Sequence, residues 1–207
     1  MEIIKPSYEI LTNINGIEIL KFIEKISRVC YKSEDKIDLT SYTIFIKKLV
    51  ANNHLAMLEH FNISIKFIHN REFTHELVRH RVASYAQEST RYINYAKQNE
   101  GLIFIKPYWF DKQEHLIETW QALMLNIENN YISMKNFGLS PQAIRGILPN
   151  DIKTEIVVTT NLREWKHILE LRLASSAHPD MRRILYPLAL ELKNKIPIIF
   201  DNLFNTP

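Results

Sequence analysis

The chain has very few cysteines and glycines. Among its 207 residues there is one cysteine, Cys30, which excludes an internal disulfide and any metal site built from several cysteines. Such cysteine usage is typical of a protein from a reducing compartment. The four glycines, at positions 16, 101, 138 and 146, cannot form the GxGxxG or P-loop sequences that cradle phosphates. A nucleotide bound here must therefore have its phosphates held by side chains and helix ends.

The sequence also lacks long hydrophobic runs and a strong net charge. No segment approaches the roughly 18 consecutive apolar residues that a membrane span needs, and the N-terminal stretch MEIIKPSYEI lacks the pattern of a signal peptide. The formal net charge is only +3, so any basic site must be local. We therefore expect a cytoplasmic protein without membrane contact, folded as a single domain over residues 1–207.

The hydrophobic pattern switches between strand and helix periods along the chain. Residues 61–67 alternate apolar and polar side chains, which predicts a strand, and residues 153–160 predict a second one. Helical periods predict helices over residues 18–31, 41–52, 71–80, 113–137, 161–173 and 179–195. Because these elements interleave without regular βαβ repeats, we predict an α+β fold with a small, largely antiparallel sheet flanked by helices.

Three side chains are candidate nucleophiles. Cys30 lies on the apolar stripe of the helix predicted over 18–31, together with Phe22 and Val29, so we expect a small core residue. Ser84 and Ser89 lack the Gly-x-Ser-x-Gly elbow of serine hydrolases. Covalent catalysis by any of the three is therefore not expected.

The segment HELVRH looks at first like the zinc-binding sequence HExxH. His75 and His80 are, however, five positions apart rather than four, which places them about 140° apart around a helix. Two side chains on different faces cannot hold one metal ion, and we expect no metal site.

The stretch RHRVASYAQESTRY, residues 79–92, concentrates hydrogen-bond donors. It contains the pattern RHRxxSxxxxSxR, which resembles the diagnostic motif of the flavin-dependent thymidylate synthases. The resemblance extends to His54 and to Glu59-His60 before the first strand, and to three further segments. These segments are IRGILP (144–149), NLREWKHILELR (161–172) and DMRR (180–183).

The resemblance implies an enzyme that converts dUMP to dTMP. Methylenetetrahydrofolate would supply the carbon, and FAD reduced by NADPH would supply the hydride. It also implies the fold specific to this family and a homotetramer whose active sites form where chains meet. Because dUMP, FAD and folate all carry negative charge, we expect the binding site to be cationic.

The resemblance also assigns ligand contacts to individual residues. The positions at which the family contacts flavin are Ala56, Arg79, His80, Arg81, Gln87, Asn161, Arg163 and His167. The positions at which it contacts dUMP are Glu76, Arg79, Gln87, Glu88, Ser89, Thr90, Arg91, Arg145 and Arg172. Arg172 is the implied catalytic residue, because a guanidinium at the uracil edge favours loss of the N3 proton. No cysteine needs to attack the pyrimidine ring.

The chain departs from the family pattern at three of its positions. Ala56 stands where a serine or threonine usually bonds the flavin, Glu76 where a glutamine is common, and Ser176 where many relatives have a histidine.

Two other interpretations of the function remain open. The basic helix 71–81 could bind nucleic acid, although its glutamates and the low net charge weaken that alternative. The chain could also bind flavin or nucleotide without turning over.

Overall fold

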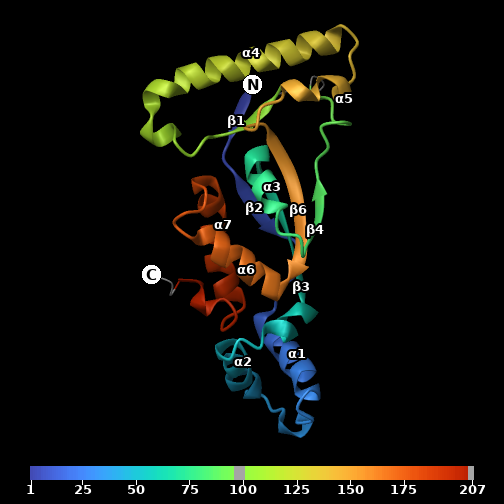
Figure 1. Cartoon of the computed structure of the whole chain (residues 1–207), viewed down its shortest axis with the longest axis vertical. Helices are drawn as coiled ribbons and strands as arrows, with labels where there is room; N and C mark the ends of the chain where they lie inside the picture. Colours follow the sequence, from blue (N-terminus) through green and yellow to red (C-terminus); the bar gives the residue numbers. More distant parts are fainter. Residues whose placement is uncertain (96–100, 205–207) are drawn as a thin grey trace. The chain divides into compact units, whose positions relative to one another are not determined.

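The computed structural model describes residues 1–95 and 101–204 (Figure 1). Its strands are β1 (Glu2–Ile4), β2 (Ser7–Ile10), β3 (Asn62–Asn70), β4 (Ser84–Gln87), β5 (Ile103–Ile105) and β6 (Lys153–Asn161). Its α-helices are α1 (Gly16–Val29), α2 (Ser41–Ala51), α3 (Arg71–Leu77), α4 (Ile117–Asn136), α5 (Pro141–Ile144), α6 (Leu162–Leu173) and α7 (Pro179–Lys195). Among these described residues, no helix is long and apolar enough to cross a membrane.

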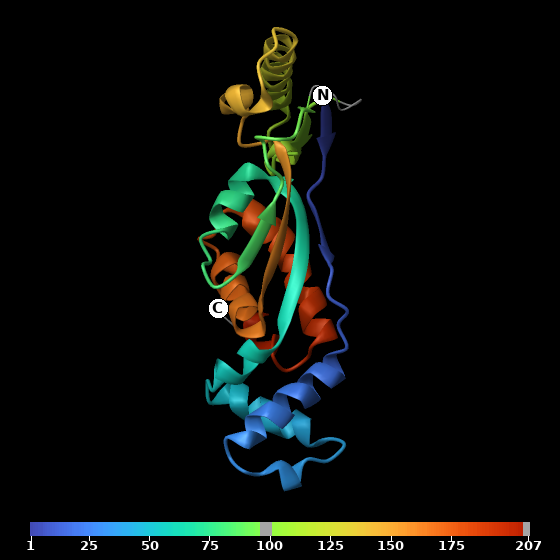
Figure 2. The same cartoon turned by 90° about the vertical axis from the view of Figure 1, so that its right-hand side faces the viewer.

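The main sheet has four strands in the order β2-β3-β6-β4 (Figure 2). The N–H of Arg71 bonds to the carbonyl of Asn150, and the N–H of Leu162 bonds to the carbonyl of Phe61, so β3 and β6 run antiparallel. A separate pair, β1 with β5, is parallel. The predicted class, helices with a small and largely antiparallel sheet, is confirmed.

The described residues form two compact units. Unit 1 comprises residues 1–8, 66–79 and 85–157, and unit 2 comprises residues 9–65, 80–84 and 158–207. In unit 1 a cluster around Phe104, Trp120 and Tyr131 forms the core. In unit 2 α6 packs on α7, and the indole N–H of the fully buried Trp165 donates to the carbonyl of Ile63 at 3.0 Å. The expectation of one domain over residues 1–207 stays a prediction.

The two strands predicted from alternation are present. In β3 the side chains of Ile63, Ile65 and Phe67 are fully buried, as the alternation predicts. In β6 every second residue is buried from Thr154 to Thr160. Both strands therefore turn one apolar face to the core and one polar face away from it.

The helix ends follow the local chemistry of the sequence. The side chain of Asn161 accepts a hydrogen bond from the N–H of Glu164 at 2.9 Å and caps α6. Ser140 caps α5 in the same way. Gly138, with φ of 89°, follows the last residues of α4 in the left-handed conformation that a side chain disfavours.

Part of the face of α1 that the sequence predicts to be buried is exposed in the structure. Phe22, Val29 and Cys30 are exposed, whereas Glu24 and Arg28 are buried. The Arg28 guanidinium lies 2.7 Å from a Glu24 carboxylate oxygen, so the two charges neutralise each other inside the fold. A prediction from the spacing of apolar residues considers only those residues, and it therefore cannot identify a buried ion pair.

The prediction of a helix over 71–80 followed by a loop is also partly wrong. Helix α3 ends at Leu77, and residues 84–87 form strand β4. The phenol of Tyr85 donates to the carbonyl of Leu77 at 2.9 Å, which ties the strand back to the helix end. The four residues of β4 are too few to show the alternation that predicts a strand. Their extended conformation depends instead on hydrogen bonding to β6. Strands β1, β2 and β5 were likewise not predicted.

Candidate functional site

A pocket of about 530 Å³ lies at the start of α6 in unit 2, and we call it the α6 pocket. Its lining residues are Leu55, Glu59, Val82, Asn161, Arg163, Glu164, Lys166, His167 and Glu170. Three of the predicted flavin contacts, Asn161, Arg163 and His167, are therefore brought together. Val82, from the middle of the RHRxxSxxxxSxR motif, joins them, because the side chain of Thr160 bonds to its carbonyl.

The local sequence of α6 explains this arrangement. Arg163 and His167 are four residues apart and both exposed, so they share one helix face. Leu162, Trp165 and Leu169 are fully buried on the other face. The packing of the apolar face therefore turns the polar face toward the pocket.

The charge of the α6 pocket differs from the cationic site expected. Arg163 pairs with Glu59 at 2.6 Å, and Lys166 pairs with Glu170 at 2.8 Å. Glu164 adds a third carboxylate to the lining. The pocket thus carries carboxylates beside each cation, because side chains from η2 (Leu55–His60) and α6 pair their charges within unit 2.

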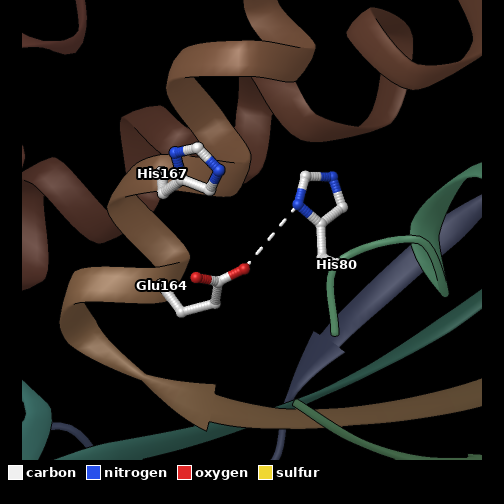
Figure 3. A group of neighbouring side chains, drawn as sticks. All are labelled: His80, Glu164 and His167. Carbon is white, nitrogen blue, oxygen red and sulfur yellow. Dashed lines mark ion pairs between the residues drawn. The ribbon is translucent and has the colours of Figure 1, made fainter. Parts of the chain in front are cut away.

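His80, the central residue of RHR, is buried in unit 2 next to α6 (Figure 3). Its Nε2 accepts a hydrogen bond from the Nε–H of Arg172 at 3.0 Å. Its Nδ1 lies 3.7 Å from a carboxylate oxygen of Glu164, and its ring meets that of His167 edge-on at 6.0 Å between centroids. Burial, and then the positive charge of Arg172, lower the pKa of His80 to about 4. His80 is therefore neutral at neutral pH.

This pKa predicts a pH-dependent stability. In the unfolded chain a histidine titrates near its ordinary pKa of 6.5, so the unfolded state binds the proton more readily. The stabilisation is complete above about pH 6.5 and falls by up to roughly 3 kcal/mol as the pH drops toward 4. Replacing His80 with glutamine, which does not titrate, should flatten this part of the curve in urea unfolding. Parallel curves for both proteins between pH 7 and 4 would contradict the assignment.

His80, Glu164 and His167 also form a set that could hold a metal ion, since their ligand atoms lie within 4.8 Å of one another. The hydrogen bond from Arg172 occupies the Nε2 lone pair of His80, so in the neutral ring the proton sits on Nδ1, facing Glu164. A metal on Nδ1 would have to displace that proton beside a permanent positive charge. The geometry therefore disfavours a metal ion here.

A second pocket, of about 600 Å³, lies on the polar face of the sheet in unit 1, and we call it the β6 pocket. Its lining residues are Lys66, Ala86, Gln87, Glu88, Ile93, Lys153, Glu155 and Val157. The ammonium of Lys153 lies 3.0 Å from Glu88 and 2.7 Å from Glu155. Burial alone would lower the pKa of Lys153, but the two carboxylates more than offset it and raise that pKa.

Two of the predicted dUMP contacts, Gln87 and Glu88, line the β6 pocket. The amide of Gln87 donates to Thr74 at 2.9 Å and to Thr154 at 3.3 Å, which holds it against the interior. The carboxylate of Glu88 accepts from the phenol of Tyr95 at 2.7 Å. Burial, and then this bond to Glu88, raise the pKa of Tyr95 far above its ordinary value.

Sequence reasoning missed the two lysines of the β6 pocket. Lys66 and Lys153 belong to no motif, and each stands alone on a strand. The signal that could have found them is their outward position in the alternation of β3 and β6. Two outward lysines on paired strands predict a local positive charge on that face.

Arg91 of unit 1 contacts the short helix α5, which Arg145 follows directly. Arg91 Nε donates to the side chain of Gln142 at 3.1 Å, and Arg145 follows Gln142 by three residues at the end of α5. Both arginines are exposed. Ser89 is turned to its own segment, because its hydroxyl accepts from the N–H of Arg91 at 3.3 Å. Thr90, between them, is half-buried.

The remaining predicted contacts lie outside these two pockets. Glu76 is half-buried in α3, and its carbonyl accepts from the N–H of the exposed Arg79. Arg81 is exposed in unit 2. Ser176, one of the departures from the family pattern, is exposed after the end of α6.

Ala56 lines a third pocket of unit 2, of about 360 Å³, together with Cys30, His54 and Arg163. The expectation that Cys30 is a small core residue is therefore wrong. Cys30 follows the last residue of α1, where the chain leaves the helix and the side chain reaches solvent.

The fold is shared with a solved nucleotide methylase. The crystal structure of the UMP/dUMP methylase PolB from Streptomyces cacaoi bound with 5-Br dUMP matches with a TM-score of 0.81 at 19% identity, covering 99% of this chain and 97% of PolB. A PolB structure bound with 5-Br UMP also gives a TM-score of 0.81, at 17% identity, over 97% of this chain and 95% of PolB. At this identity the likeness defines the fold.

Sequence comparison goes further than the fold. Residues 16–198 match the family model of the thymidylate synthase complementing proteins, and the chain belongs to this family. A flavin-dependent thymidylate synthase of Pyrococcus furiosus is 36% identical over 152 residues, covering 72% of this chain and 62% of the relative. The enzyme of the same name from Geobacter sulfurreducens is 30% identical over 182 residues, covering 84% and 77%. The match spans less than two thirds of the Pyrococcus furiosus protein. The family match confirms the resemblance that the sequence analysis based on RHRxxSxxxxSxR.

Proposed function

We propose that this chain is a flavin-dependent thymidylate synthase, a methyltransferase that converts dUMP to dTMP. Methylenetetrahydrofolate is the carbon donor and NADPH the reductant. The observation that carries the proposal is the α6 pocket, where Val82 of the motif meets Asn161, Arg163 and His167 from a segment far away in sequence. The family membership over residues 16–198 supports the same conclusion.

The α6 pocket suits part of an FAD molecule. Its volume of about 530 Å³ lies in the range of ligand sites, roughly 300–1,000 Å³. The guanidinium of Arg163 can donate to the pyrophosphate, and the amide of Asn161 and the ring of His167 offer further donors. Glu59 and Glu164 can accept from hydroxyl and N–H groups of the cofactor. Bound there, the flavin would supply the hydride, while these side chains bind and orient it.

Substrate binding is assigned to residues of unit 1. Arg91, which donates to Gln142, and Arg145, three residues after Gln142, are suited to the dUMP phosphate because each guanidinium can donate two hydrogen bonds. In the β6 pocket Lys66 and Lys153 offer N–H donors beside Gln87 and Glu88. Glu88 and Glu155 offset the charge of the two lysines and fix their positions, so the phosphate itself is assigned to the arginines.

Arg172 is assigned to the uracil edge. Its guanidinium stays charged at every physiological pH, so it stabilises the anion that forms when the N3 proton leaves. The Nε–H of Arg172 donates to His80, and the planar guanidinium carries its N–H donors in a fixed fork, a shape that suits the uracil edge. The ionised ring is a better carbon nucleophile at C5, and no enzyme thiolate is required.

The active form is proposed to be a homotetramer with active sites shared between chains. Exposed apolar side chains on and just after α4 support a subunit contact, with Leu123 55%, Leu125 46% and Phe137 85% exposed. Sedimentation of the purified chain tests this directly. A mass of one chain at micromolar concentration would contradict it.

The function itself is tested with the full chain and added FAD. A yellow complex should form, bleach when NADPH is added without oxygen, and produce dTMP from dUMP and methylenetetrahydrofolate. A chain that binds no flavin but binds DNA with a steep salt dependence would contradict the proposal. A yellow complex that bleaches but forms no dTMP would mean that the chain binds flavin without methylating dUMP.

Replacing Cys30 with serine tests the absence of a thiolate nucleophile. The variant should keep its rate of dTMP formation within about twofold, because exposed and conservative substitutions rarely change more. Cys30 lines a pocket with Ala56 and Arg163, whereas Gln87 and Glu88 line the β6 pocket, which does not include it. Loss of turnover in a folded variant that still binds FAD would show that the thiol takes part.

A further inference from the structure

Two charged groups of α6 contact the same imidazole. Glu164 lies 3.7 Å from one ring nitrogen of His80 (Figure 3). Arg172 lies 3.0 Å from the other ring nitrogen. Glu164 and Arg172 are eight residues apart, which is about 12 Å along a helix. A single buried ring from the RHR motif therefore joins two distant turns of α6.

The charges decide how the ring carries its proton. Arg172 cannot give up a proton, so Nε2 of His80 must be the acceptor of their hydrogen bond. The proton of the neutral ring then sits on Nδ1, which faces the carboxylate of Glu164. The low pKa of His80, about 4, agrees with a neutral ring. The Glu164 carboxylate thus faces the Nδ1–H of His80, and the Nε2 of His80 faces the guanidinium of Arg172.

This arrangement can orient the guanidinium of Arg172 through the His80 ring. At 3.7 Å the carboxylate of Glu164 attracts the N–H of His80 electrostatically, which favours one orientation of the ring and makes the opposite nitrogen a stronger acceptor. Here the opposite nitrogen holds Arg172. We propose that Glu164 is a positioning residue, which acts through His80 to hold the guanidinium of Arg172 in the orientation that the reaction needs. The family resemblance assigned no role to Glu164, and the effect on turnover rests on the proposed function.

The capping of α6 does not account for this carboxylate. Asn161 caps the helix through the backbone N–H of Glu164, which any residue at position 164 supplies. The side chain of Glu164 is mostly buried, at 14% exposure, and burial raises the pKa of its carboxyl group. Holding a partly buried carboxylate against His80 is therefore a feature separate from helix formation.

The first test needs no turnover. In the full chain as purified, with ¹⁵N-labelled histidine and arginine, NMR should show His80 as the Nδ1–H form, assigned with His80→Gln. The Nε–H of Arg172 should exchange with water several-fold faster in Glu164→Ala than in the wild type. Glu191→Gln, which changes a half-buried acid on α7, should leave that exchange unchanged. An Nε2–H form of His80, or an Arg172 signal that Glu164→Ala does not alter, overturns the proposal.

The second test measures turnover. Glu164→Ala should lower kcat by about tenfold with little change in KM for dUMP, and Glu164→Gln, which keeps an acceptor oxygen, should recover part of that loss. In a His80→Ala background the same change should have no further effect, because the connection is already broken. Additive losses would overturn the proposal. A wild-type chain without turnover, but with the expected NMR result, would refute the proposed function and leave the positioning of Arg172 by Glu164 intact.

Discussion

Replacing Arg172 with alanine should lower the rate of dTMP formation by about 100- to 1,000-fold, the usual cost of removing a donor to a developing anion. The residue is half-buried in the last turn of α6, so the variant should fold. Because Asn161, Arg163 and His167 line the α6 pocket without Arg172, FAD binding should persist. The measurement is kcat for dTMP, with flavin absorbance and unfolding recorded on the same samples.

Lysine at position 172 provides the matched comparison. It keeps the positive charge but offers a point charge instead of a planar fork, so it should recover only a small part of the rate. Lys195→Ala, which removes a partly exposed cation at the end of α7, should leave the rate unchanged. Wild-type turnover in Arg172→Ala would remove this residue from the mechanism.

Replacing Glu24 with alanine should destabilise the fold by about 3–5 kcal/mol, because it leaves the buried Arg28 without its carboxylate. Arg28 would keep its position over the ring of Phe45, 4.5 Å from the centroid, longer contacts to Ser33 and a weaker attraction to Asp38. The carboxylate also accepts from the hydroxyl of Ser41 at 2.9 Å, so the variant loses this hydrogen bond between α1 and α2. Urea unfolding measures the change.

Glu18 on the same helix is the control. Its pair with Lys21 is exposed, at 3.3 Å, so Glu18→Ala should cost less than about 1 kcal/mol. Changing both Glu24 and Arg28 to leucine should cost less than Glu24→Ala alone, since no buried charge is left unpaired. Equal destabilisation by Glu18→Ala and Glu24→Ala would show that the buried pair contributes little.

The sequence predicts an element well where local physics decides it. The alternation of Ile63, Ile65 and Phe67 identifies β3 because the side-chain period of a strand is two. Asn161 caps α6 because its oxygen satisfies a backbone N–H that has no partner within the helix. Arg163 and His167 fall into one pocket for the same local reason, their spacing on a helix with an apolar opposite face.

Prediction fails where contacts between distant residues decide. Glu24 and Arg28 are buried only because they pair with each other and because Ser41 and Phe45 pack on them. Strand β4 exists because β6 is beside it. Cys30 is exposed because α1 ends there, which an apolar count of the helix does not reveal.

The site shows the same division. The family resemblance located His80 and Arg172, but the contact of the Glu164 carboxylate with the other side of the His80 ring comes from the fold. Lys66 meets Glu155 only when β3 pairs with β6, and Lys153 meets Glu88 only when β4 pairs with β6. A residue that acts through another residue, or through a neighbouring strand, has no signature of its own in a single sequence.

Release of tritium from [5-³H]dUMP tests the central claim most directly, because replacing the C5 hydrogen is required for methylation. The account predicts that the wild-type chain and Cys30→Ser both release tritium and form dTMP when FAD, NADPH and methylenetetrahydrofolate are present, and that Arg172→Ala does neither. Tritium release that disappears in a folded, flavin-binding Cys30→Ser variant, or no dTMP from the complete wild-type mixture, would contradict it.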